Sequence, residues 1–278
     1  MKPHYRITLI YLIVGFLWIF FSDNLVHNLF FFDNDTMTMA QHLKGFFFVA
    51  FTGTLLFFLI RRDFNRLIRA KERLIESYNQ TMQGWIRVMD MRHKETKDHT
   101  RRVTEMTLSL AKRFGITDYK ELENMERGCL LHDMGKIGIP DSILLKSGKL
   151  TSEEWKQMKK HPEIAYEIMK KIDFLIPSID IPYCHHEKWD GTGYPRGLRR
   201  ENIPLHARIF AIVDVWDALT NTRLYKPAWD EDRVLQLFRQ EAGHHFDPEV
   251  VELFIRHYED LKREVAISNR REWEDNNE

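Results

Sequence analysis

Cysteine is scarce in this chain, which has only Cys129 and Cys184 among 278 residues. The two lie far apart in apolar surroundings, which argues against a disulfide framework or a thiolate metal site. Charge is balanced, with 41 basic and 41 acidic residues, so no overall field exists to capture a nucleic acid polymer. Any anionic ligand must therefore be held by local groups.

Beyond Gly84 the sequence also lacks an alternating apolar pattern long enough for a sheet, and it has no internal repeat. Apolar residues recur there at helical spacing instead. The pattern, with its capping residues, predicts helices over 85–93, 99–114, 119–131, 152–160, 162–170, 177–186, 204–220, 230–241 and 248–261. We therefore expect an all-α domain over 85–265, followed by a frayed polar tail over 266–278.

Two segments near the start, 7–22 and 45–60, contain no charged residue. Each is slightly shorter than the ~17 to 25 residues of a bilayer span, but flanking aromatic and basic side chains can make up the length. No small-residue cleavage site follows Phe21, which argues against a cleaved signal peptide. We predict a two-helix membrane hairpin over 1–62, formed by two N-terminal transmembrane helices.

Basic residues flank this hairpin on its outer ends, with Lys2 and Arg6 before it and Arg61 and Arg62 after it. The loop between the segments is acidic. Cytoplasmic loops carry an excess of Lys and Arg, so both ends should face the cytoplasm. The prediction is a multi-pass protein of the inner (cytoplasmic) membrane whose following domain is cytoplasmic.

A linker helix is predicted over 63–84, because no proline or glycine interrupts the apolar periodicity between Phe64 and Gly84. The spacing is close to a heptad, although Lys71 falls at a core position. Two interpretations stay open: a short parallel coiled coil that makes a homodimer, or a helix that lies on the following domain.

The stretch HHEKWDGTGYP, residues 185–195, places two adjacent histidines beside a glycine-rich turn. Other imidazoles and carboxylates interrupt the helical patterns. Glu95 and His99 are four residues apart, so a helix puts them on one face. The remaining members of the set are His132, Asp133, His161 and Asp214. Buried groups of this kind need partners.

Imidazoles and carboxylates without thiolates suit a hydrolytic centre of first-row metals such as iron, manganese, nickel or zinc. The number of ligands argues for more than one ion. With ions bridged by Asp133, an activated water could attack phosphorus at neutral pH.

With these residues, the sequence resembles the HD-GYP phosphodiesterases, a subgroup of the HD hydrolase superfamily. The resemblance covers roughly 85–261 and is carried by His132, Asp133, Gly135 and Lys136, by HHEKWDGTGYP, and by VDVWDALTNTRLYK over 213–226. It implies an HD-GYP helical bundle that hydrolyses cyclic di-GMP to pGpG and often onward to GMP, coupled here to a membrane anchor. The cofactors it implies are two or three divalent ions, with iron preferred and manganese or nickel as alternatives.

The resemblance also assigns roles to single residues. The metal ligands it implies are His99, His132, Asp133, His161, His185, His186 and Asp214, with Glu95 as the extra carboxylate of members that hold three metals. Asp133 and Lys136 are the catalytic residues, and Arg223, Lys226 and Tyr194 lie on the substrate side. Supporting roles fall to Asp98, Arg102, Asp190 and Asp217.

Other functions compete with this interpretation. The domain could act on another cyclic dinucleotide such as cyclic GMP-AMP, or on a mononucleotide, although Arg223 and Lys226 speak against the latter. A catalytically weak module would serve instead as a dock for diguanylate cyclases. The complete set of ligands argues against a module without activity.

Overall fold

The computed structural model describes residues 3–29, 34–92, 97–222 and 227–275, and it divides the chain into two compact units, Met1–Met82 and Gln83–Glu278. In the described residues the secondary structure is helical throughout, apart from one isolated bridge between Ala242 and Phe246. The expected all-α class is confirmed for this part of the chain.

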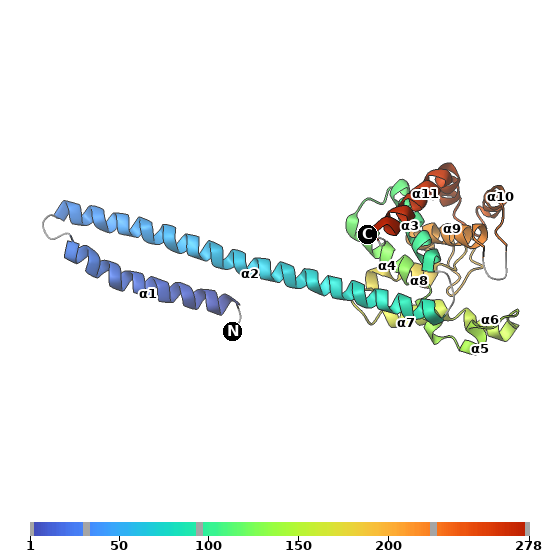
Figure 1. Ribbon diagram of the computed structural model, residues 1–278, viewed down its shortest axis with the longest axis horizontal. Coiled ribbons are helices and arrows are strands. Elements are labelled where there is room, and N and C mark those ends of the chain that lie inside the picture. The colour runs from blue at the N-terminus through green and yellow to red at the C-terminus, as the bar shows by residue number, and fades with distance from the viewer. Residues whose placement is uncertain (1–2, 30–33, 93–96, 223–226, 276–278) are drawn as a thin grey trace. The chain divides into compact units, whose positions relative to one another are not determined.

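In the first unit, helix α1 (Pro3–Leu29) lies beside the first part of α2 (Asn34–Arg92) (Figure 1). Arg6 forms an ion pair with Asp63, and the Trp18 ring lies 5.9 Å from that of Phe48. Side chains such as Phe46, which is 75% exposed, face outward along both helices. By length and composition, His4–Ser22 and a stretch within Thr38–Met89 are apolar enough to cross a membrane.

Helix α2 differs from the expected organisation, because the second apolar segment, the linker and the first helix of the domain form one uninterrupted helix. The sequence suggested a break near Gly84. An isolated glycine costs only about 1 kcal/mol in a helix interior, and a Cβ at this position would meet no atom within 4 Å. Without a proline or a competing cap, the helix therefore continues to Arg92.

The second unit is built from helices around a main apolar core, with a smaller apolar cluster at Cys184, Ile203 and Ala207 (Figure 1). Its helices after α2 are α3 (Lys97–Phe114), α4 (Tyr119–Leu130), η1 (Met134–Gly138), α5 (Asp141–Leu144), α6 (Ser152–Met158), α7 (His161–Met169), η2 (Ile176–Ser178), α8 (Asp180–Cys184), η3 (Arg200–Asn202), α9 (Leu205–Thr220), α10 (Glu231–Glu241) and α11 (Pro248–Asp275).

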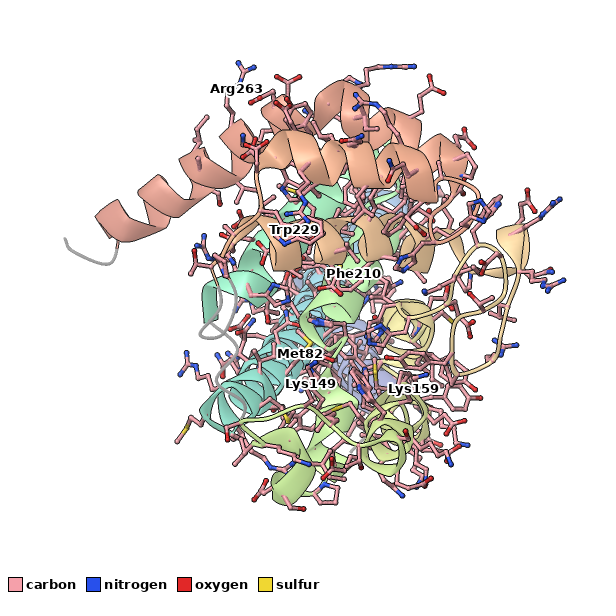
Figure 2. The ribbon with its side chains drawn as sticks, turned by 90° about the vertical axis from the view of Figure 1, so that its right-hand side faces the viewer. Met82, Lys149, Lys159, Phe210, Trp229 and Arg263 are labelled. Atoms are coloured by element: carbon pink, nitrogen blue, oxygen red, sulfur yellow. The ribbon has the colours of Figure 1, made fainter. Side chains whose placement is uncertain are left out.

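Helices α3, α9 and α11 pack against one another, while α5 and α6 lie on the opposite side of the unit (Figure 1). Phe210 of α9 lies at the centre of the bundle (Figure 2), and Phe238 and Phe254 are also fully buried. Cys129 and Cys184 are buried and unpaired with each other, as small core residues would be.

Capping residues set several helix starts as the sequence predicts. Asp118 caps α4 by accepting a bond from the backbone N–H of Glu121, and Thr151 with Glu154 forms a capping box at α6. The tail prediction is less accurate, because α11 continues to Asp275. Within the predicted tail, the Ser268 hydroxyl lies 2.9 Å from a Glu105 carboxylate oxygen, so a tertiary contact supports the continued helix.

Candidate metal centre

Helix ends carry most of the predicted metal ligands toward one place in the second unit. His132 and Asp133 follow α4, His161 begins α7, and His185 and His186 follow α8. His99 lies in the first turn of α3, and Asp214 lies within α9. The imidazoles of His99, His132, His161 and His185 are at most 3% exposed.

The ligand atoms form two groups. His161, His185 and His186 make one, and His99, His132 and Asp214 make the other. Within each group, the atoms that could bind a metal all lie within 4.8 Å of one another. The spacing suits one ion for each group.

Asp133 contacts both groups with different oxygens. Its Oδ2 lies 3.2 Å from Nε2 of His132, and its Oδ1 lies 3.4 Å from Nε2 of His161. Lys136 donates to the same Oδ2 at 2.5 Å. A carboxylate in this position can bridge two cations, and the ammonium places a further positive charge at its edge.

The second nitrogen of each buried imidazole indicates why these rings suit metal binding. Nδ1 of His132 lies 2.8 Å from the Cys129 carbonyl oxygen, and Nδ1 of His161 lies 2.8 Å from that of Met158. A carbonyl oxygen only accepts, so Nδ1 donates in each ring and Nε2 is the nitrogen available to a metal. Nδ1 of His185 contacts the carbonyl oxygens of Ile181 and Pro182 in the same way.

These Nε2 atoms converge on one another. Nε2 of His161 lies 3.3 Å from Nε2 of His185, and two lone pairs at this distance repel unless a cation lies between them. Imidazole nitrogens suit divalent first-row metals, whereas alkaline-earth ions prefer oxygen ligands. The residues present therefore fit divalent transition-metal ions.

Electrostatics distinguish the two groups. Burial lowers the pKa of His185 well below its ordinary value, and positive charge on neighbouring imidazoles lowers it further. Burial and His161 likewise lower the pKa of His186 to about 3. Both rings are neutral at pH 7 and need release no proton to bind a metal.

The second group favours positive charge. Burial opposes a charge on His99, but the carboxylates of Asp214 and Asp217 outweigh it and raise the pKa to about 10. Burial also opposes ionisation of Asp133, yet the charges of Lys136 and His132 hold its pKa well below the ordinary range. Asp133 is therefore an anion at neutral pH.

Asp217 orients His99 from behind. Its Oδ2 lies 2.6 Å from Nδ1 of His99, and Arg102 donates to both carboxylate oxygens, at 2.6 and 2.9 Å. The Asn221 amide adds a bond at 3.0 Å. A carboxylate held on Nδ1 fixes the imidazole tautomer and raises its basicity as a ligand.

The loop after His186 is organised by Glu187, a residue that the sequence-based reasoning passed over. Its carboxylate is buried and accepts bonds from the backbone N–H groups of Arg196 at 2.7 Å and Leu198 at 2.9 Å. A Cβ on Gly193 would lie 2.3 Å from the Lys188 nitrogen, so only glycine fits there. In the sequence, the position of this acid directly after two histidines indicates its structural role.

Tyr194 lies against the metal centre. Its ring stacks on His186 with centroids 4.7 Å apart, and the Lys159 ammonium lies 5.3 Å from its centroid. Asp190 instead closes a turn by accepting bonds from the backbone N–H and hydroxyl of Thr192.

The structure thus brings together all predicted metal ligands except Glu95. That residue lies outside the described residues, as do Arg223 and Lys226, and so does the side chain of Asp98. Their predicted roles stay predictions.

The sequence profile of the HD domain family matches residues 71–250, which is more than half of the chain. The protein therefore belongs to the HD domain family. Its curated relatives include cyclic-dinucleotide phosphodiesterases.

A "Cyclic di-GMP phosphodiesterase" of Vibrio cholerae is 43% identical over 180 residues, which cover 60% of this chain and 37% of the relative. The "Cyclic di-GMP phosphodiesterase response regulator RpfG" of Xanthomonas campestris is 39% identical, covering 69% of this chain and 51% of the relative. The "3'3'-cGAMP-specific phosphodiesterase 2" of Vibrio cholerae is 37% identical, covering 68% and 36%. The chain thus spans between a third and a half of the length of these relatives.

Proposed function

We propose that this protein is a metal-dependent phosphodiesterase that hydrolyses cyclic di-GMP to linear pGpG, to GMP or to both. One observation carries the proposal: Asp133 contacts both groups of candidate ligands, and Lys136 donates to it. Two adjacent cation sites joined by a carboxylate suit the hydrolysis of a phosphodiester, in which negative charge develops on phosphorus.

Each residue has a separate task in this proposal. The imidazoles and carboxylates of the two groups would hold two divalent ions and Glu95 would help to hold a third, with iron preferred over manganese or nickel. When bound, the ions would supply an activated water and would stabilise charge on the phosphoryl oxygens. The Lys136 ammonium forms an ion pair with Asp133. From this position it could stabilise charge on the phosphoryl oxygens or protonate the leaving group.

The names of the relatives support the choice of substrate. Those from Vibrio cholerae and Xanthomonas campestris that act on cyclic di-GMP are 43% and 39% identical to this chain. The relative named for 3'3'-cGAMP is 37% identical, so the mixed cyclic dinucleotide is the second candidate. The sequence identities to the two kinds of relative are close, so the choice between the two substrates needs an assay.

Parallel turnover assays test the proposal. The full chain, loaded anaerobically with iron or manganese, is given cyclic di-GMP, 3'3'-cGAMP or a guanine mononucleotide, and the products are separated. We expect cyclic di-GMP to give the highest kcat/KM. Faster turnover of 3'3'-cGAMP would transfer the assignment to the second candidate, and no turnover of either cyclic dinucleotide would reject the proposed function.

Substrate capture is assigned to Arg223 and Lys226 as predicted phosphate contacts. In an Asp133→Ala background, which removes turnover, Arg223→Ala should weaken cyclic di-GMP binding by roughly 1.5 to 3 kcal/mol, the range for a lost charged hydrogen bond. Titration calorimetry measures the difference. Equal affinity of the two proteins would withdraw the phosphate-binding role.

We further propose that the first unit anchors the enzyme in the cytoplasmic membrane. The outward apolar side chains of α1 and α2 and the two candidate spans support this anchor. Reporter fusions after Arg73 should behave as cytoplasmic and fusions near Asp33 as external. The reverse pattern would contradict the topology.

Self-association through the linker is a further part of the proposal. Phe64, Leu67 and Leu74 are 61%, 68% and 52% exposed in the single chain, which leaves an apolar surface for a second copy. Light scattering in detergent, comparing the parent with Leu67→Glu, tests the homodimer. The predicted contact with diguanylate cyclases stays a prediction.

A further inference from the structure

Arg92, the last residue of α2, is bonded to the segment that carries Lys136. Its Nη1 donates to the carbonyl oxygens of Lys136 at 3.2 Å and Ile137 at 2.6 Å, and its Nη2 donates to that of Ile139 at 2.6 Å. Its Nε donates to Asp141 at 2.9 Å. One guanidinium therefore spans η1 and the start of α5.

The carbonyls are the important partners among these. The Asp141 side chain is 66% exposed, and an exposed ion pair contributes little. The three carbonyls belong to one short 3-10 segment and its end, where the last backbone acceptors lack partners within the helix; that of Lys136 also accepts the Ile139 N–H. The planar guanidinium has donors in fixed directions and suits such an arc of acceptors.

This segment also sets the position of the catalytic pair. The backbone N–H of Lys136 donates to the Asp133 carbonyl oxygen at 2.9 Å, and the side chain of Lys136 donates to the Asp133 carboxylate. The N–H of Ile139 donates to the Lys136 carbonyl oxygen at 3.0 Å, the same oxygen that Arg92 contacts. A displacement of the carbonyls would therefore displace Lys136.

Helix α7 also limits the freedom of this segment. A Cβ on Gly135 would lie 1.7 Å from the carbonyl oxygen of His161, so η1 packs directly on the start of α7. The segment η1 is therefore held both by α7 and by Arg92. The Arg92 contact depends on one side chain, so a single substitution can remove it.

We infer that Arg92 is a positioning residue, which holds η1 so that Lys136 and Asp133 keep their catalytic geometry. The inference rests on the proposed function. Because α2 is one uninterrupted helix from Asn34 to Arg92, the residue that ends this helix also controls the segment that carries Lys136.

The test compares Arg92→Ala and Arg92→Lys with the exposed Arg87→Ala on the same helix, in the metal-loaded full chain. We expect kcat of Arg92→Ala to fall by about 10- to 100-fold, because small misplacements of reacting groups have effects of this size. KM and metal content should stay near the parent values. A lysine supplies fewer directed donors, so Arg92→Lys should recover only part of kcat, and Arg87→Ala should match the parent.

A double variant separates positioning from general stabilisation. If Arg92 acts through Lys136, Arg92→Ala should add almost nothing to the loss in kcat caused by Lys136→Ala. Losses that multiply would overturn the inference, as would a parental kcat in folded Arg92→Ala.

Hydrogen exchange gives a readout that does not depend on the substrate. The amide of Ile139 should exchange faster in Arg92→Ala than in Arg87→Ala, with α9 unchanged. If the parent cleaves neither cyclic dinucleotide, the kinetic test uses bis(p-nitrophenyl) phosphate as the substrate instead. The two measurements distinguish failure of the proposed function from failure of the Arg92 assignment. Unchanged exchange of the Ile139 amide would reject the Arg92 assignment.

Discussion

The two units of the chain place polar and apolar side chains in opposite ways. In the first unit, large apolar side chains such as Phe46 and Phe47 are 75% and 66% exposed. In the second, Phe254 is fully buried, and the imidazoles of His132 and His161 are buried as well. An exposed apolar surface calls for lipid or a partner, whereas buried imidazoles call for a cation or a hydrogen bond. Apolar burial therefore stabilises only the second unit in water.

The largest effect should come from the carboxylate that joins the two ligand groups. Asp133→Ala should lower turnover by roughly 10³-fold or more. This loss exceeds the ~10- to 100-fold loss typical when a residue that hydrogen-bonds to a metal ligand is replaced. Cyclic di-GMP binding should fall much less, because the proposed phosphate contacts of Arg223 and Lys226 would remain. Stopped assays with calorimetry measure both quantities.

Asp118→Ala is the control for that change, since Asp118 caps α4 and contacts no candidate ligand among those described. It should lose about 1 kcal/mol of stability and keep its turnover. A turnover of Asp133→Ala within tenfold of the parent would contradict a bridged centre.

The same substitution in the two units tests the comparison of their surfaces. Phe254→Ala should destabilise the second unit by about 3 to 5 kcal/mol, the cost of a large cavity in a packed core. Phe254 lies 5.2 Å from the Trp216 ring and 5.5 Å from the Phe238 ring, measured between centroids. Phe47→Ala should leave the stability of that unit unchanged. Thermal unfolding in detergent, followed by tryptophan fluorescence, measures both, and equal losses would refute the contrast.

A smaller effect is expected from Asp217, which hydrogen-bonds to the candidate ligand His99. Asp217→Asn removes the charge that holds Nδ1 of His99 and should weaken metal affinity about 10- to 100-fold. Asp260→Asn on α11 serves as the control. Competition with a chelator measures affinity, and loss of a single ion per chain would localise the effect to the group of His99, His132 and Asp214. Unchanged affinity would mean that Asp217 only supports the fold.

The smallest effect concerns pH. Burial lowers the pKa of His245 from 6.5 to about 4, and Lys188 lowers it further against the opposing charge of Asp190. Above pH 6.5 the ring is neutral in folded and unfolded chains alike. Below that pH the unfolded chain takes up the proton first, so stability falls as pH falls toward 4.

Relative to His245→Gln, the parent should therefore lose about 2 kcal/mol between pH 7 and pH 5. Denaturant titrations at the two pH values measure this difference. A loss of the same size in both proteins would assign it to other groups.

Parts of the fold follow from local patterns. The starts of α4 and α6 agree with their caps, and α9 and α10 begin within one residue of the predicted positions. Elements without their own pattern were missed, such as η1 and α5, because a few residues carry no periodicity. The continuous α2 was also missed, since one glycine suggested a boundary that its low cost does not impose.

The sequence alone determined the kinds of side chain in the site, because imidazoles and carboxylates amid apolar helices need partners wherever they fold. It also determined the helical class and the apolar character of the first unit. Only the tertiary structure decided that Asp133 meets both ligand groups, that Asp217 lies behind His99, and that Arg92 holds η1. The contact of Arg92 with Lys136 joins residues 44 positions apart, and that of Asp217 with His99 joins residues 118 positions apart. A linear pattern carries no information on the distance between side chains that the packing of helices brings together.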